Sequence, residues 1–494
     1  MNLDLESGAT RRWFRIAAWS IVALLSALKF CYLSADFPND SLWMVDQAKY
    51  TDEGWWASGA VAHILTGHWY VAGDYNPAAA LPVWSAMLVA LFHFTGVSVI
   101  AARALNVAFS VATLAVVFAL VLRYTNLKSE APATLAVLLL AVSPFAWVFN
   151  RLAILDTLVM FEFCLLLLAA SFAASKRLWP LLSLTILVTV MILTKTTAAL
   201  LVPSALWLAW AAMGYRRGGF LRALLAGVVA PVVLLKGYEA LVKALGYGGD
   251  FQYFFDVNAM PDIDWRHSFL TLWQFLENCL WVDRVLYPVG LAILLTAVVW
   301  KRRLWRNPLF TAAWIALVAQ AVFMFSRQDD YAPRYFLVML APLVWVVALA
   351  FGEALVNARR TAVLLLLAMA AAVIANGVMI RHFLVVRDYD FRDAALSIRD
   401  IVRSRPEQKP LLLGVSASQL SLMVGVPSIN DGYGTEDPRE KVERYQPGWY
   451  VGWNDTNPES EDFLSGYRFE KIARYEALDD DDRGALTLYK MIRK

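Results

Sequence analysis

The chain has 494 residues, of which 59% are hydrophobic and 17% are charged. Soluble domains carry about 25% charged residues, so this composition excludes an ordinary soluble protein and indicates a polytopic membrane protein. The net charge of +3 is too small to argue for a nucleic-acid partner. Three cysteines, Cys31, Cys164 and Cys279, indicate neither a disulfide framework nor a cysteine-rich metal site.

Apolar runs of roughly 15–25 residues are candidates for membrane-spanning helices. The sequence predicts eleven of them, and the first lacks a signal-peptide cleavage site, so we expect it to be retained. The predicted spans are residues 13–33, 99–122, 132–149, 157–174, 178–194, 197–213, 221–245, 284–300, 308–326, 333–355 and 361–384.

Basic residues in short loops predict the orientation of these spans, because they favour the cytoplasmic side. Arg11, Arg12 and Arg15 place the N-terminus in the cytoplasm, and Arg123 with Lys128 continues that side. Eleven spans keep the alternation consistent and leave the C-terminus outside. We therefore expect a multi-pass protein of the cytoplasmic (inner) membrane.

Residues 34–98 form the predicted first outer loop. Within it, residues 81–96 are hydrophobic enough to span, but a span there would break the basic pattern. At about 16 residues, this segment better suits an interfacial or re-entrant helix. The tryptophans of the loop favour the headgroup region: they are Trp43, Trp55, Trp56, Trp69 and Trp84.

The composition changes at about residue 386. Residues 411–415 and 486–491 are predicted strands, and residues 391–403 have the pattern of an amphipathic helix. About 110 residues are enough for a separate core. We therefore predict a transmembrane catalytic domain over residues 1–385, which includes the outer loop, and an extracytoplasmic soluble α/β domain over residues 386–494.

The acidic segment 43–54 follows the first predicted span directly. If it is helical, Asp46, Tyr50 and Glu53 share one face with Lys49, whereas Asp52 points elsewhere. Asp46 suits a general base within reach of an acceptor hydroxyl. The alternative is a solvated helix at the membrane surface whose charges only face water.

Asp156 lies among apolar residues at the predicted outer junction of two spans, in the segment Asn150-Arg-Leu-Ala-Ile-Leu-Asp-Thr157. An aspartate at membrane depth is costly unless it is paired or functional. A structural pair with Arg151, or a helix cap through Asp156, is the alternative. Function is favoured because the predicted topology brings Asp46 and Asp156 to the same side of the membrane.

Three more residues are candidates for binding substrate, two of them cations that could hold a phosphate group. Lys195 stands at a tight outer turn, against the basic-inside trend; phosphate binding explains it, and snorkelling to the headgroups explains it almost as well. Arg334 and Tyr335 open a late span, where Asp329 and Asp330 are alternative partners for Arg334. No histidine spacing predicts a metal site, but the carboxylates leave a divalent cation possible.

Taken together, these motifs resemble the polytopic GT-C glycosyltransferases, in particular the protein O-mannosyltransferase and aminoarabinose-transferase branch. The resemblance covers residues 13–355. It rests on an acidic motif in the first loop, an arginine and aspartate before the fourth span, a lysine after a Leu-Thr pair, and a late Arg-Tyr pair. The matching positions are Asp46, Tyr50, Glu53, Arg151, Asp156, Lys195, Arg334 and Tyr335.

Two positions depart from the family pattern. Gln47 stands where the family often has glutamate, and Asn76-Pro77 lacks the lysine that often precedes the prolines. Lys195 or Arg334 would therefore take more of the phosphate binding.

The resemblance implies an inverting glycosyltransferase that moves a sugar from a polyprenyl-phosphate donor to a hydroxyl of a lipid, glycan or protein acceptor. In this interpretation Asp46 and Asp156 carry the chemistry and the other matching residues bind substrate. The alternative is a lipid or sugar transporter or flippase without transferase activity, in which the same charges line a substrate pathway. No internal repeat of the kind common in transporters is visible, and no P-loop suggests an ATP-driven pump.

Overall fold

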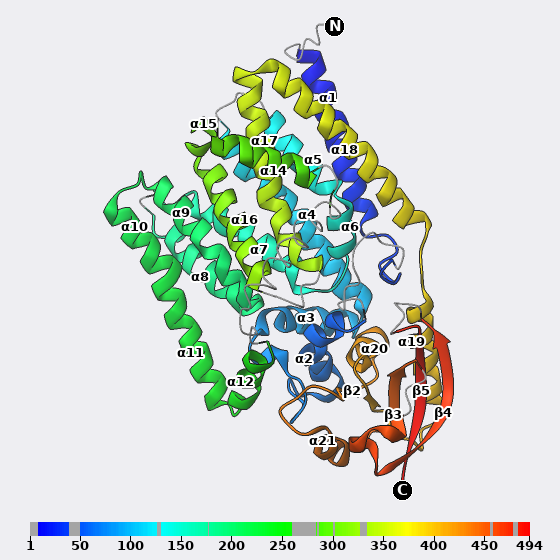
Figure 1. Cartoon of the computed structure of the whole chain (residues 1–494). Coiled ribbons are helices and arrows are strands. Elements are labelled where there is room, and N and C mark those ends of the chain that lie inside the picture. Colours follow the sequence, from blue (N-terminus) through cyan, green and yellow to red (C-terminus); the bar gives the residue numbers. More distant parts are fainter. Residues whose placement is uncertain are drawn as a thin grey trace.

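A computed structural model gives the fold of the chain (Figure 1). It describes residues 8–38, 50–125, 130–175, 177–258, 283, 286–299, 302–326, 333–454, 458–477 and 483–494. Asp46, the leading candidate of the acidic segment, lies outside the described residues, as do Lys49, Cys279, Asp329 and Asp330.

The N-terminal three quarters of the chain are helical. Their longer helices are α1 (Gly8–Leu28), α4 (Val99–Tyr124), α5 (Ala131–Ala141), α7 (Leu155–Ala170), α8 (Trp179–Thr194), α9 (Val202–Ala212), α11 (Ala230–Ala244), α14 (Leu286–Val299), α16 (Pro308–Ser326), α17 (Leu340–Asn357) and α18 (Arg359–Val385). Shorter elements join them: α6 (Pro144–Phe149), η3 (Thr196–Leu201), α10 (Arg217–Leu224), the π-turn η4 (Leu225–Val229), α12 (Gly248–Val257), α15 (Arg302–Trp305) and η5 (Pro333–Met339).

Helix α17 lies at the centre of this bundle. It is apolar around its whole circumference, and a helix of that kind must be buried on every side. It packs against α5, α14, α16 and α18, and Trp345 in its middle is fully buried. The apolar sequence of α17 thus fixes the core around which the other helices gather.

Among the described residues, four helical stretches are long and apolar enough to cross a membrane. They are Val99–Tyr124, Arg217–Ala244, Pro333–Asn357 and Arg360–Ser404. Other predicted spans coincide with shorter apolar helices, such as α8 and α16. The count of eleven spans therefore stays a prediction.

The loop predicted over residues 34–98 contains α2 (Asp52–Thr66), η2 (Pro77–Ala79) and α3 (Pro82–Thr95). Helix α3 occupies the segment predicted as an interfacial helix: a proline begins it and Gly96 ends it. Its buried face, with Trp84 and Phe92, packs in a cluster that also holds residues of α2 and α4. The two helices lie between the bundle and the strands of the C-terminal part (Figure 1).

The C-terminal part holds a mixed sheet of five strands in the order β2-β1-β3-β5-β4. Strand β1 pairs in parallel with β2 and β3, whereas β5 pairs antiparallel with β3 and β4. The elements are α19 (Asp390–Ser404), β1 (Leu412–Leu413), α20 (Ala417–Val424), β2 (Ser428–Ile429), α21 (Pro438–Tyr445), β3 (Trp449–Trp453), η6 (Pro458–Ser460), η7 (Asp462–Leu464), β4 (Tyr467–Glu476) and β5 (Ala485–Arg493).

The amphipathic helix and the two strands predicted for this part are present as α19, β1 and β5. The buried face of α19 packs on the sheet together with Tyr50, whose ring stacks on Phe391 with the ring centroids 4.3 Å apart. The C-terminal core therefore includes a residue from the segment before α2. The division into domains at residue 385 stays a prediction.

Candidate functional site

Two buried ion pairs mark one small region where the bundle meets α2. The first joins Asp156, in the first turn of α7, to Lys195, which follows the last residue of α8. Lys195 Nζ lies 2.6 Å from Asp156 Oδ1, and Asp156 is 3% exposed. The N-terminal end of α7 also favours a carboxylate through its helix dipole. Both Asp156 and Lys195 were sequence candidates, but their pairing was not predicted.

The second pair joins Asp52, the first residue of α2, to Arg334 in η5. Arg334 Nη2 lies 2.8 Å from Asp52 Oδ2, and both side chains are largely buried. The sequence offered Asp329 and Asp330 as partners of Arg334, but these positions lie outside the described residues. In the structure a carboxylate of α2 pairs with this cation.

The ring of Tyr335 links the two ion pairs. Lys195 Nζ lies 4.6 Å from the ring centroid, and Arg334 Cζ lies 5.1 Å from it. A cation near an aromatic face is stabilised by the ring quadrupole. Tyr335 therefore holds the ammonium and the guanidinium close together, although both carry positive charge.

A cavity of about 90 Å³ opens onto these groups. Its charged and hydroxyl groups come from α7, the α8–η3 junction and η5, whereas α2, α12, α16 and the residue before α3 supply mainly apolar side chains. The lining residues are Trp56, Leu81, Leu155, Asp156, Lys195, Thr196, Thr197, Phe254, Asn258, Phe323, Arg334 and Tyr335. The cavity can thus offer two cations and several hydroxyls to an anionic group.

Glu53, the neighbour of Asp52, has a different environment. It is fully buried, and its two carboxylate oxygens accept hydrogen bonds from Arg103 Nε at 2.8 Å and Nη2 at 2.6 Å. The backbone N–H of Ala153 donates to the same carboxylate at 2.7 Å, and Gln419 Nε2 donates at 2.9 Å. Glu53 therefore joins α2, α4, the segment before α7, and α20.

The Gln419 side chain has a second contact in this junction, because its Oε1 accepts the backbone N–H of Gly54 at 2.7 Å. The two helices approach so closely that a Cβ atom on Gly54 would lie 2.2 Å from the backbone nitrogen of Gln419. Only glycine permits this approach. The start of α2, which carries Asp52, is thereby fixed to the C-terminal part.

The segment before α7 is fixed from α4 as well. Asn106, which is fully buried, donates hydrogen bonds to the carbonyls of Leu152 and Ile154 at 2.5 and 2.7 Å. Together with the bond from Ala153 to Glu53, these contacts set the backbone directly ahead of Asp156. The backbone that leads into Asp156 is therefore held in place by hydrogen bonds.

The structure brings four of the sequence candidates to this cavity, namely Asp156, Lys195, Arg334 and Tyr335. Three candidates lie elsewhere. Tyr50 packs in the C-terminal core, and Glu53 is occupied in its junction.

The third candidate, Arg151, donates from Nη2 to the carbonyls of Cys31 and Tyr32. It lines another small cavity, so the alternative of an Arg151–Asp156 pair is wrong. Arg151 anchors the end of the first helical segment instead.

The sequence prediction placed Asp52 on a different face from Glu53, so Asp52 was not a site candidate. In the structure the two side chains do have different partners, and Asp52 pairs with Arg334. The prediction assigned helical positions by counting from Asp46, whereas α2 begins at Asp52 itself. The signal that could have located the start is the order Thr51-Asp52-Glu53, because acidic residues gather in the first turn of a helix. A helix that begins there directs Asp52 and Glu53 to two different neighbours.

Within the residues that the structure describes, no group of three or more His, Cys, Asp and Glu side chains is placed to hold a metal ion. Asp52 and Asp156 are each paired with a cationic side chain instead.

Residues 77–235 match the family profile described as dolichyl-phosphate-mannose-protein mannosyltransferase. This stretch includes Asp156 and Lys195. The predicted resemblance to the GT-C glycosyltransferases is confirmed. No curated protein sequence is significantly similar to the chain.

Solved structures share the fold over nearly the whole chain. ArnT from Cupriavidus metallidurans bound to undecaprenyl phosphate superposes with a TM-score of 0.63 at 15% identity, covering 95% of this chain and 97% of ArnT. The apo state of ArnT gives a TM-score of 0.59 at 16% identity, with 98% of both chains covered. The archaeal oligosaccharyltransferase AglB from Archaeoglobus fulgidus, in complex with an inhibitory peptide and a dolichol-phosphate, gives 0.54 at 12% identity, covering 98% of this chain and 74% of AglB.

Proposed function

We propose that the protein is a membrane glycosyltransferase that moves a sugar from a polyprenyl-phosphate donor to an acceptor hydroxyl. The observation that carries the proposal is the convergence of two cations, Lys195 and Arg334, on one cavity of a GT-C-like fold. A neighbour with this fold was crystallised with undecaprenyl phosphate, whose phosphate is an anionic group of the kind this cavity suits.

In the proposed reaction the acceptor oxygen attacks the anomeric carbon while the bond from that carbon to the phosphate oxygen breaks. The electron pair leaves with the lipid phosphate, and a carboxylate takes the proton of the hydroxyl. One displacement of this kind inverts the anomeric configuration. Lys195 and Arg334 stabilise the charge that develops on the leaving phosphate.

The carboxylates Asp156 and Asp52 hold the two cations in position while the cavity is empty. A phosphate that enters competes with them for Lys195 and Arg334. Each carboxylate that is released in this way becomes available to orient an acceptor or to accept a proton. Asp46 is proposed as the general base, with Asp156 positioning the acceptor, and Glu53, Tyr50 and Arg151 serve the architecture around the site.

The decisive experiment measures sugar release from a panel of radiolabelled polyprenyl-phosphate sugars by the purified protein. Wild type should consume one donor, and the Asp46→Asn and Lys195→Met variants should lose this activity while they remain folded. Consumption of no donor, even with a cell-envelope extract as acceptor, would overturn the proposal. A liposome flux assay would then test the transporter alternative.

We also propose eleven membrane spans, with the N-terminus in the cytoplasm and residues 386–494 as an extracytoplasmic α/β domain. Exposed Ser465 offers a labelling position in that domain, and exposed Arg217, the first residue of α10, offers one on the opposite predicted side. A membrane-impermeant maleimide should label Ser465→Cys on spheroplasts, and should label Arg217→Cys only after permeabilisation. Both cysteine variants are made in a protein whose native cysteines have been replaced by serine. The reverse pattern would overturn the orientation.

A further inference from the structure

A second cavity, much larger than the first, lies on the other side of α2. Its volume is about 530 Å³, within the range of about 300–1,000 Å³ that is common for ligand pockets. Residues 58, 61, 62 and 65 of α2 line it, whereas Trp56 of the same helix lines the ion-pair cavity. At about 100° per residue these sets point in opposite directions, so the two cavities are separate.

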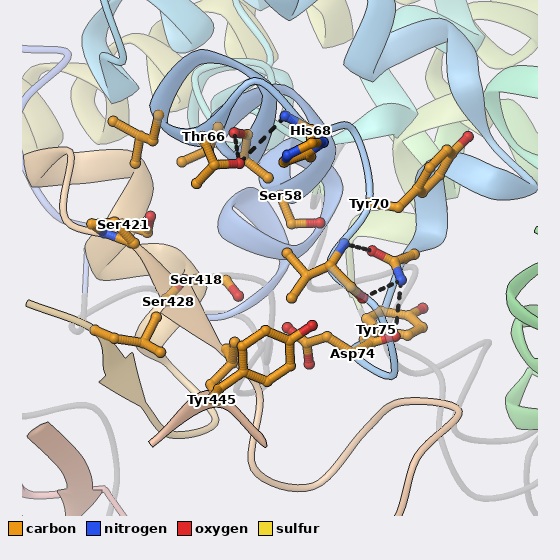
Figure 2. Close-up of a pocket in the computed structure, with 18 of the residues that line it drawn as sticks. Ser58, Thr66, His68, Tyr70, Asp74, Tyr75, Ser418, Ser421, Ser428 and Tyr445 are labelled. Atoms are coloured by element: carbon orange, nitrogen blue, oxygen red, sulfur yellow. Dashed lines mark hydrogen bonds between the residues drawn. The ribbon is translucent and has the colours of Figure 1, made fainter. Parts of the chain in front are cut away.

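The opposite wall belongs to the C-terminal part. Residues of α20 and of the segments around β1 and β2 face α2 across the cavity, and Tyr445 of α21 closes one end (Figure 2). The Tyr445 hydroxyl donates to the carbonyl of Ala72 at 2.7 Å, which ties this end to the loop after α2. The cavity is therefore formed by two parts of the chain that are far apart in sequence.

The polar groups of the cavity are mainly hydroxyls. Ser418 and Ser421 of α20, and Ser428 of β2, point their side chains to this region (Figure 2). Among the described residues, none of these three hydroxyls has a hydrogen-bond partner, although Ser418 and Ser421 are 8% and 2% exposed. Their Oγ atoms are open to the cavity, so they are available to hydrogen-bond a ligand or water there.

The charged groups of the cavity are already compensated. Asp74 is 6% exposed and lies 3.1 Å from Lys441 Nζ, and its carboxylate also accepts the backbone N–H of Asn430 at 3.0 Å. Lys409 is exposed at the edge and donates to the carbonyl of Tyr445. A cationic or anionic ligand would thus find no uncompensated buried partner here.

Much of the rest of the lining is apolar. Val61, Ala62 and Leu65 of α2 face Leu411 and Ile429 on the sheet side, and tyrosine rings complete the wall. An alkyl chain would fit these walls but would cover the serine hydroxyls without giving them a hydrogen bond, which is costly. A sugar meets both demands, because its ring has apolar C–H faces and a rim of hydroxyls.

We propose that this cavity is a binding site for an uncharged saccharide of about two rings, separate from the ion-pair cavity. The serines of α20 and β2 bond the sugar hydroxyls, and the aliphatic wall of α2 packs on the ring faces. The site does not depend on the proposed transfer reaction, since its lining shares no residue with the cavity of Lys195 and Arg334.

The test is calorimetric titration of the full chain in lipid nanodiscs with neutral disaccharides (maltose, cellobiose, sucrose and trehalose), glucuronic acid and decanol. We expect one of the neutral disaccharides to bind with a Kd of about 1 mM or tighter. Binding of none of them, or binding of glucuronic acid or decanol in their place, overturns the proposal.

Two variants locate the site. Ala62→Trp fills the cavity from α2 and should abolish binding, whereas Ser465→Trp adds the same ring at an exposed position away from the cavity lining and should leave binding unchanged. Ser421→Ala breaks no hydrogen bond with a described residue, and it should weaken binding about 2- to 12-fold. Unchanged affinity in Ala62→Trp would overturn the assignment. Lys195→Met should retain saccharide binding whether or not it alters sugar transfer, which separates this proposal from the proposed function.

Discussion

Asp52 and Arg334 form a buried ion pair, with Asp52 Oδ2 2.8 Å from Arg334 Nη2. The pair connects the first residue of α2 to the start of η5, two elements whose contact no local pattern predicted. Because Arg334 lines the ion-pair cavity, the position of its guanidinium depends on the start of α2.

Replacement of Asp52 by asparagine should reduce sugar transfer by about 100-fold or more, at roughly 1.4 kcal/mol per tenfold change. The variant removes the negative charge that Asp52 presents to Arg334, so the guanidinium is held less firmly. Initial rates with saturating donor would measure the effect. Asp400→Asn is the matched control, because it removes an exposed carboxylate from its pair with Arg399, and such pairs contribute only about 0–1 kcal/mol. Equal rates in the two variants would remove Asp52 from the site.

The pair of Lys195 with Asp156 allows stability and activity to be separated. Lys195→Met leaves a buried carboxylate without its partner, which costs about 3–5 kcal/mol in buried pairs. The double variant Lys195→Met/Asp156→Asn removes both charges, and it should regain much of the thermal stability without regaining activity. The four proteins of this double-mutant cycle are wild type, Lys195→Met, Asp156→Asn and the double variant. Thermal unfolding in detergent and a donor-consumption assay would be measured on each. Recovery of activity in the double variant would argue that the pair only supports the fold.

Gly54 offers a test of the contact between α2 and α20. Gly54→Ala forces the two helices apart, because the new Cβ would meet backbone atoms of Gln419. We expect a loss of several degrees in Tm and faster proteolysis of the C-terminal part. Gly237→Ala is the control: nothing lies within 4 Å of its Cβ position, so alanine should stabilise that helix by about 0.5–1 kcal/mol. Equal proteolysis rates in both variants would contradict the role given to this contact.

Stability should fall as the pH rises from about 4 to 7. Burial raises the pKa of Asp36 to about 7 and that of Asp431 to about 6, both from an ordinary value of 3.8. In this window the folded chain binds more protons than the unfolded chain, so raising the pH favours unfolding. Asp36→Asn should flatten the dependence, since its carbonyl oxygen can still accept the backbone N–H of Phe391. Thermal unfolding of wild type and the variant at pH 5 and pH 8 would measure the pH dependence of stability. A steeper pH dependence in the variant would contradict its assignment to Asp36.

The extent of sequence-based prediction is clearest in four residues. Lys195 and Asp156 stood out because charge is costly among apolar residues, and the structure brings them into contact. Asp52 was missed because its helix phase depended on where α2 begins, and helix ends are poorly defined by periodicity alone. Glu53 was assigned to substrate because nothing local reveals Gln419, a hydrogen-bond partner 366 positions away.

The same holds for the fold. Apolar periodicity located many of the helices and several C-terminal elements, because burial leaves a local pattern. The packing of Tyr50 against Phe391 leaves no local pattern in the sequence, since it joins segments that are distant in the chain. Local patterns therefore predict elements, whereas the contacts that assemble the site are long-range.

The junction of Glu53 with Gln419 also has a consequence for biosynthesis. Ribosomes make the chain from its N-terminus, so α2 is complete long before α20 exists. Until residue 419 has been made, Glu53 has only its partners in the N-terminal part, and closing so long a loop delays the last contact further. We expect the nascent protein to remain inactive at least until α20 has been made and can reach Glu53.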